Sequence, residues 1–117
     1  MFGFQSLEVW RVAVEYADQV YAATRSFPTD ERFGLTSQLR RASVSISSNI
    51  AEGSGRNSKR DFIRFIAIAY GSVLETVSQA TIARRQSFLS VKDNRDLCET
   101  AQRLAKMLSR LRTSLEH

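Results

Sequence analysis

The strongest constraint on this fold is a hydrophobic period of 3.6 residues that runs through almost the whole chain. Apolar side chains recur every three or four residues, the spacing that places them on one face of an α-helix. One proline and five glycines in 117 residues leave few points at which a helix must break. The pattern predicts an all-α protein of a few long helices.

The first two predicted helices are bounded by turn residues. The first begins after Ser6, a candidate N-cap, and ends before the only proline. The second has Thr29 or Asp30 as its candidate N-cap and runs to about Glu52. Gly53 then stands where a left-handed residue commonly ends a helix, so we expect it to be the C-terminal cap.

The last two predicted helices each open with a capping box. Ser58-Lys59-Arg60-Asp61 starts a helix that continues to about Ser87, and Ser90-Val91-Lys92-Asp93 starts the fourth. Short connections between four helices predict an antiparallel up-down four-helix bundle, a single domain over residues 1–114. Residues 115–117 resemble the remnant of an expression tag and carry no functional argument.

The third helix is more apolar than one bundle requires. A bundle helix needs one apolar face, and this helix has further apolar residues outside its main stripe: Ile63, Ile68, Tyr70, Leu74 and Val77. Gly71, which costs a helix about 1 kcal/mol relative to alanine, favours close packing there. These additional apolar residues predict self-association of the chain. The alternative is that this helix is simply the most deeply buried of the four.

Composition excludes several classes of site. The only histidine is His117, in the tag-like ending, so the usual serine and cysteine triads and most transition-metal sites are excluded. We expect no catalytic residues and no cofactor. The lone Cys98 excludes a disulfide framework and is expected to be a small core residue. With no secretory signal in residues 1–25, and an apolar run over 65–74 too short to span a bilayer, we expect a cytoplasmic protein without membrane contact.

The stretch GSGRNSK between the second and third helices is not a nucleotide-binding loop. It lacks the Gly-Lys pair of the Walker motif, and the dinucleotide fingerprint requires a preceding strand. We interpret it as a turn between helices. A hydrolase that uses Glu52 or Glu75 remains an alternative, although a structural role for these carboxylates fits the pattern better.

Basic residues point to a polyanionic partner. The net charge is +5, and 14 of the 17 basic residues are arginine, which binds phosphate in planar, bidentate contacts. Several lie at the predicted start of the third helix, where free N–H groups also favour anions. A solvated basic face is the alternative for any one of them. The candidate nucleic-acid contacts are Arg40, Arg41, Arg56, Lys59, Arg60, Arg64, Arg103, Lys106 and Arg110.

Two segments, FQSLEVWRVAVEYADQVY and LTSQLRRASVSISSNIAEGSGRNSKRDFIRFIAIAYGSVLETVSQ, resemble the bacterial four helix bundle protein family. This family was first noticed in intervening sequences of 23S ribosomal RNA genes. The resemblance covers roughly residues 4–112. Ser47 and Thr76 depart from it, since relatives often carry proline and leucine there, and both are expected to be packing variants.

The resemblance implies a cytoplasmic protomer that assembles into a ring-like homopentamer. Related proteins accompany diversity-generating retroelements, in which a basic pentamer binds the reverse transcriptase and nucleic acid. It implies no catalytic residues, and the matching residues are expected to determine the fold: Asn49, Glu52, Gly53, Gly55 and Arg56.

We therefore predict a non-enzymatic, homo-oligomeric helical module that binds the backbone of RNA or DNA through arginine and lysine, with poor sequence specificity. The alternative is an adaptor for a protein partner, such as a reverse transcriptase or another polymerase, with no intrinsic nucleic-acid binding.

Overall fold

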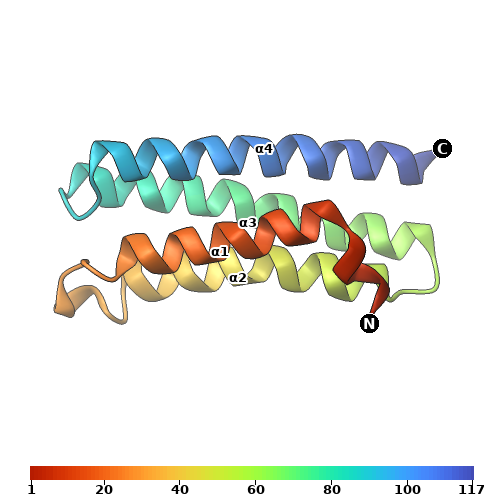
Figure 1. The fold of residues 1–117 in the computed structure, drawn as a ribbon, viewed down its shortest axis with the longest axis horizontal. Helices are drawn as coiled ribbons and strands as arrows, with labels where there is room; N and C mark the ends of the chain where they lie inside the picture. Colours follow the sequence, from red (N-terminus) through yellow and green to blue (C-terminus); the bar gives the residue numbers. More distant parts are fainter.

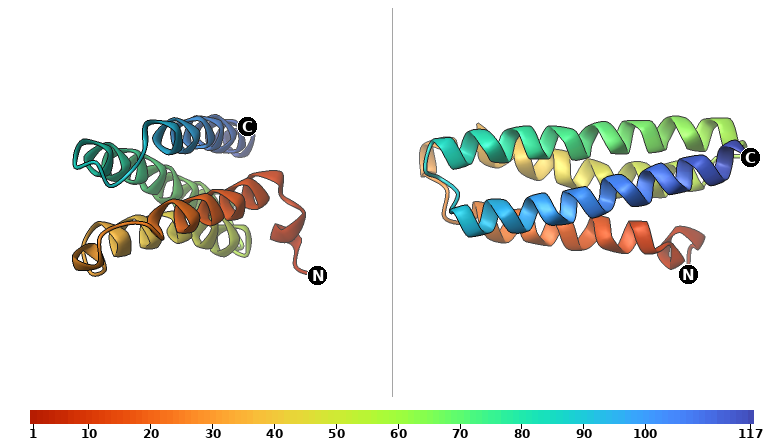
Figure 2. Two further views of the ribbon diagram at one scale, coloured as in Figure 1. Left: turned by 60° about the vertical axis from the view of Figure 1, so that its left-hand side comes forward. Right: turned by 90° about the horizontal axis from the view of Figure 1, so that it is seen from above.

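Four long helices run alternately up and down in a computed structural model that describes residues 1–117 (Figure 1). They are α1 (Glu8–Thr24), α2 (Leu35–Ser54), α3 (Lys59–Arg85) and α4 (Val91–Glu116). Two 3-10 turns, η1 (Gly3–Ser6) and η2 (Thr29–Glu31), precede α1 and α2. Both termini and the α2–α3 turn lie at one end of the bundle, and the α1–α2 and α3–α4 connections at the other (Figures 1 and 2). The predicted all-α up-down architecture is confirmed.

The core consists of one buried stripe from each helix. The apolar stripes predicted for α2, α3 and α4 are buried, apart from partly exposed residues at their ends. On α1 the structure buries the stripe that contains Val12, Tyr16 and Val20. Trp10 and Tyr21 lie at the margin of the core or in solvent. Cys98, expected in the core, is only partly buried.

The predicted caps of α1 and α2 are wrong. Ser6 closes the preceding 3-10 turn by donating its hydroxyl to Gly3 O (2.8 Å), and Leu7 is the N-cap of α1 without a side-chain bond. Neither Thr29 nor Asp30 caps α2, because both lie in η2. The Glu31 carboxylate instead accepts a hydrogen bond from Leu35 N at 3.1 Å.

The predicted N-cap serines of α3 and α4 are confirmed, although neither Asp61 nor Asp93 returns the hydrogen bond that would complete a capping box. Ser58 and Ser90 accept hydrogen bonds from the backbone N–H three residues on, at 3.1 and 3.0 Å. Helix α3 ends at Arg85, and Ser87 takes the left-handed conformation just beyond it (φ 65°). Among non-glycine residues it is the only one with positive φ, so the sharp reversal into α4 depends on it.

Gly53 was expected to be a left-handed cap, and this is wrong as well. It lies inside the last turn of α2, it is buried, and no glycine in the chain has positive φ. A Cβ at Gly53 would stand 2.6 Å from Phe65 Cβ and 3.0 Å from Phe62 Cδ1. The absence of a side chain therefore serves the close approach of α2 to α3 and not the ending of a helix.

A buried hydroxyl pair joins α1 to α3. Tyr16 is 1% exposed and donates its hydroxyl to Thr76 Oγ1 at 2.8 Å, and Thr76 donates to Val73 O at 2.6 Å. Burial raises the pKa of Tyr16, although the bond to Thr76 acts in the opposite direction. Thr76, which departs from the leucine common in the resembling family, therefore supplies the acceptor that this tyrosine requires.

By length and composition alone, α3 is apolar enough to cross a membrane. Within the most apolar 18-residue segment of α3, 44% is buried inside the bundle. The same composition is typical of the core helix of a globular bundle, which is the position that α3 occupies here.

Gly53→Ala is expected to lower the free energy of unfolding by about 1–2 kcal/mol. Overpacking against Phe65 costs about 1–3 kcal/mol, and the gain from removing a helical glycine offsets only part of this. Urea denaturation measures the change. Gly55→Ala is the matched control, because its Cβ would meet only Glu52 O, at an ordinary 3.6 Å. Equal stability of the two variants would contradict the packing role of Gly53.

The Tyr16–Thr76 pair predicts coupled substitutions. Thr76→Val leaves the tyrosine hydroxyl buried without an acceptor and should cost about 1–3 kcal/mol. Tyr16→Phe should cost less, about 1 kcal/mol, because Thr76 keeps its bond to Val73 O. In the double variant the loss should be smaller than the sum, as measured by a double-mutant cycle in urea. Additive losses would show that the hydrogen bond contributes nothing.

Candidate nucleic-acid interface

Four of the nine candidate contacts come together at the α2–α3 turn. Lys59 and Arg60 are exposed at the start of α3, and Arg64 follows one turn later. The guanidinium groups of Arg56 and Arg64 lie over the Phe65 ring, 4.8 and 5.5 Å from its centre. We call Arg56, Lys59, Arg60 and Arg64 the turn cluster.

Carboxylates neutralise only a small part of the turn cluster. Arg56 Nη2 lies 3.2 Å from Glu52 Oε1, and both side chains are about half exposed. Such a surface pair contributes at most about 1 kcal/mol. Lys59, Arg60 and Arg64 form no ion pair. The N-terminus of α3 adds a partial positive charge, so the cluster can bind a phosphate without first breaking a strong internal interaction.

The candidates on α4 lie along another helix. Arg103 Nη2 contacts Glu8 Oε1 at 3.2 Å and thereby links α4 to the start of α1. Lys106 and Arg110 are exposed one and two turns further on, toward the end of the bundle that carries the turn cluster. They extend the basic residues along α4, and Arg103 has a structural contact as well.

The structure separates Arg40 and Arg41 from the turn cluster. They lie 14 and 13 residues before the end of α2 at Ser54, which corresponds to roughly 20 Å along the helix. Arg41 is exposed. Arg40 is half-buried, its Nε donates to Thr24 Oγ1 at 2.9 Å, and its guanidinium lies 4.6 Å from the centre of the Tyr21 ring. The nine candidates therefore do not form one compact site.

Sequence reasoning missed two neighbours of Arg40. A pocket of about 320 Å³ at the α1–α2 connection is lined by Arg25, Arg32 and Arg40 together with three threonines, Phe27 and Pro28. The lining residues come from the end of α1, the connection and the start of α2, so no local motif marks them. The signal that could have found them is the spacing of Arg25 and Arg32 around Pro28, since a tight connection brings its two flanks together.

The two carboxylates considered for hydrolysis have partners on their own helices. Glu52 pairs with Arg56, and Glu75 Oε2 accepts a hydrogen bond from Gln79 Nε2 at 3.1 Å. Both glutamates are exposed, and neither lines any of the four surface pockets. No pocket therefore holds a substrate against either carboxylate.

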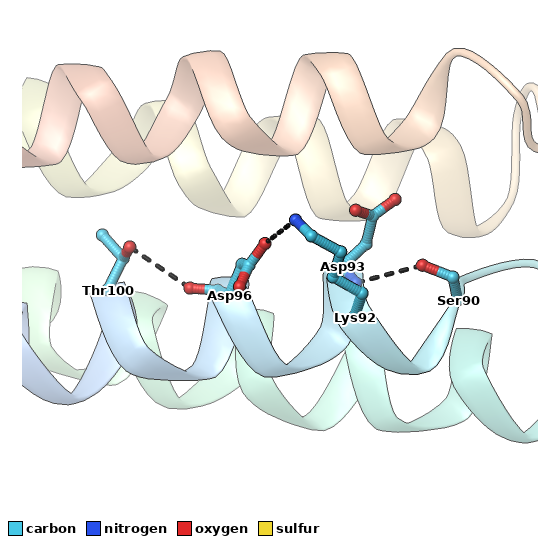
Figure 3. A network of polar contacts seen from close by, with 5 residues as sticks. All are labelled: Ser90, Lys92, Asp93, Asp96 and Thr100. Atoms are coloured by element: carbon cyan, nitrogen blue, oxygen red, sulfur yellow. Dashed lines mark hydrogen bonds and ion pairs between the residues drawn. The ribbon is translucent and has the colours of Figure 1, made fainter.

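An acidic pocket of about 230 Å³ lies between α1 and α4, with Asp93 and Asp96 in its lining. Figure 3 shows Lys92 extending forward along α4 to Asp96, whose Oδ2 lies 2.8 Å from Nζ. This hydrogen bond raises the pKa of Lys92 and lowers the pKa of Asp96. No group of three metal-ligating side chains occurs here or elsewhere in the chain. The acidic lining repels phosphate, so this pocket is not part of the candidate interface.

The geometry can be compared with known proteins. The chain resembles a crystal structure of a protein of unknown function from the S23 ribosomal protein family of Bacteroides thetaiotaomicron, with a TM-score of 0.79 and 22% identity. The match covers 86% of this chain and 94% of the other, and it shows a shared fold. No curated protein matches the sequence. The family model for the 23S rRNA-intervening sequence protein matches residues 5–110, nearly the whole bundle. This chain therefore belongs to the 23S rRNA-intervening sequence protein family.

Proposed function

We propose that this protein is a non-enzymatic, cytoplasmic, homo-oligomeric module that binds the phosphate backbone of RNA or DNA. The turn cluster is the observation that carries the proposal. Three of its four side chains are exposed and form no ion pair, and they extend from the first two turns of α3. Contacts of this kind recognise phosphate and not base sequence, so binding should be strong at low salt and nearly independent of sequence.

Self-association is supported by the outward face of α3. Ile68, Leu74 and Ile82 are 48%, 55% and 47% exposed and lie on the side of α3 that faces away from the core. Gly71 lies on this face as well, and a Cβ added there would meet nothing within 4 Å. Because this glycine weakens α3 by about 1 kcal/mol and no contact within the chain requires it, close approach of a second copy is the simplest reason for its presence.

The occupant of this face that we propose is a second copy of the same chain. The family resemblance implies a ring of five copies. Five chains at +5 each would carry +25, a charge that steers polyanions toward the oligomer over a distance set by the salt concentration. The turn cluster would then be repeated around the ring, and several weak phosphate sites would act together.

A second candidate function is that of an adaptor for a protein partner. It is favoured by an apolar groove of about 380 Å³ at the same end of the bundle, lined by Phe2, Phe4, Leu7 and Phe62 among others. Phe2 is 74% exposed and stacks on Phe4 with ring centres 6.0 Å apart. Exposed aromatic side chains beside a groove are common in protein interfaces.

The salt dependence of binding tests the first proposal. The triple variant in which alanine replaces Lys59, Arg60 and Arg64 should have a shallower slope in a plot of log affinity against log salt. The slope should fall in magnitude by about 2–3, because each phosphate contact contributes about 0.7–0.9 to it. Fluorescence anisotropy with generic single- and double-stranded RNA and DNA measures the slope.

The control removes the same number of charges elsewhere. Arg85, Lys92 and Arg95 are also two arginines and one lysine, all exposed, at the opposite end of the bundle. Their triple alanine variant should keep most of the slope. If both variants flatten it equally, binding depends on net charge and not on the turn cluster. If the wild-type protein binds no nucleic acid at low salt, the adaptor function becomes the better proposal.

Substitution of Ile68 tests self-association. Ile68→Glu should shift the protein toward smaller species in sedimentation equilibrium, because the change places charge on the proposed interface. The fold should remain, since this side chain is half exposed. Val44→Glu, on an exposed position of α2, is the control and should leave the mass distribution unchanged. If the two variants have the same distribution, the outward face of α3 is not the interface.

A further inference from the structure

A second group of arginines lines a pocket at the α1–α2 connection. This connection lies at the opposite end of the bundle from the α2–α3 turn (Figure 1). Arg25 comes from the end of α1, Arg32 follows η2, and Arg40 projects from the second turn of α2. Three guanidinium groups around one pocket of about 320 Å³ repel each other, so this arrangement requires a physical reason. The family and fold described above give none.

One of the three arginines is fixed in place before any ligand arrives. Arg40 Nε donates to Thr24 Oγ1 at 2.9 Å, and Thr24 in turn donates to Val20 O at 2.7 Å. The guanidinium also lies over the Tyr21 ring. These contacts use one N–H and one face of the group and leave the terminal nitrogens without a protein acceptor, so Arg40 presents a positioned pair of donors at the pocket.

The remaining lining is suited to an anion. No carboxylate lines the pocket, and none of its three arginines forms an ion pair. Thr29 and Thr36 belong to the lining, and neither uses its hydroxyl as a donor within the chain. Thr36 also stands in the first turn of α2, whose Leu35 N–H is already bonded to the Glu31 carboxylate, so the hydroxyl and not the helix N-terminus is its contribution to the pocket. Positive charge and hydroxyl donors therefore converge on one volume.

We propose that this pocket binds a phosphate group, with Arg25, Arg32 and Arg40 as its charged ligands and Thr29 and Thr36 as hydroxyl donors. Phosphate fits better than a carboxylate because it offers more acceptor oxygens and a second negative charge for three guanidinium groups. The pocket volume also leaves room for part of the molecule that carries the phosphate.

An exposed aromatic side chain beside the pocket points to a nucleotide as that carrier. Phe33 is 87% exposed, the most exposed aromatic side chain in the chain. The Arg32 guanidinium lies 5.2 Å from the centre of its ring, so Phe33 is next to a pocket residue. A planar base can stack on such a ring while its phosphate occupies the pocket.

Isothermal titration calorimetry with inorganic phosphate and with adenosine monophosphate tests the site. Both should bind the wild-type protein, and Arg25→Ala combined with Arg32→Ala should weaken both at least tenfold, since each lost charge-assisted contact is worth about that much. These two side chains are exposed, so the variant is expected to fold. Thr36→Val should cause a smaller loss, because it removes one hydroxyl and conserves the shape of the side chain.

The control variant combines Arg11→Ala with Arg112→Ala, which removes the same charge from exposed positions outside the pocket. It should bind phosphate as the wild type does. Absence of phosphate binding to the wild type, or an equal loss in both variants, would overturn the proposal. Phe33→Ala separates the two sources of phosphate. A loss for adenosine monophosphate alone identifies a nucleotide, and no loss for either probe identifies free phosphate.

This site and the proposed function are tested independently. The turn cluster is intact in the Arg25/Arg32 variant, and the pocket is intact in the Lys59/Arg60/Arg64 variant. The Arg25/Arg32 variant can lose phosphate binding in the pocket while it keeps the salt-dependent binding of a 5′-hydroxyl oligonucleotide. The Lys59/Arg60/Arg64 variant can lose the oligonucleotide binding while it keeps phosphate binding in the pocket.

Discussion

The close approach of α2 to α3 is the constraint on which the rest of the structure depends. Gly53 allows it, because the Phe65 side chain fills the space in which any other residue would carry its Cβ. Phe65 then serves as the surface on which Arg56 and Arg64 rest. A single packing contact in the core thus positions two of the four basic side chains of the turn cluster.

Helix α3 has two roles on its two sides. Its inner face supplies the largest share of the buried stripe, including Ile66, Ala69 and Val73, and its outer face carries exposed isoleucine and leucine around Gly71. The inner face explains why the helix is apolar enough to resemble a membrane span. The outer face has no such explanation within one chain, and this is the physical basis for proposing that copies of the protein associate through it.

Periodicity alone predicted the number of helices, their order and most of the core, because burial of one face per helix dominates the energy of a bundle. The local capping motif identified Ser58 and Ser90, since a capping serine acts through neighbouring residues. Local motifs failed for Gly53, whose role depends on Phe65 across the bundle, and for Glu31, which caps α2 from an intervening 3-10 turn. Similarly, Arg25 and Arg32 belong to a pocket that exists only once the chain has turned at Pro28.

The buried bond from Tyr16 to Thr76 has a consequence for the alignment of the helices. A core made only of leucine, isoleucine and alanine packs almost equally well when one helix slides by a turn along its neighbours. Such a slide would separate this hydroxyl pair and leave the tyrosine oxygen without a partner in an apolar interior, which costs about 1–3 kcal/mol. A single polar pair therefore fixes the register of α1 against α3, as one buried asparagine does in a coiled coil.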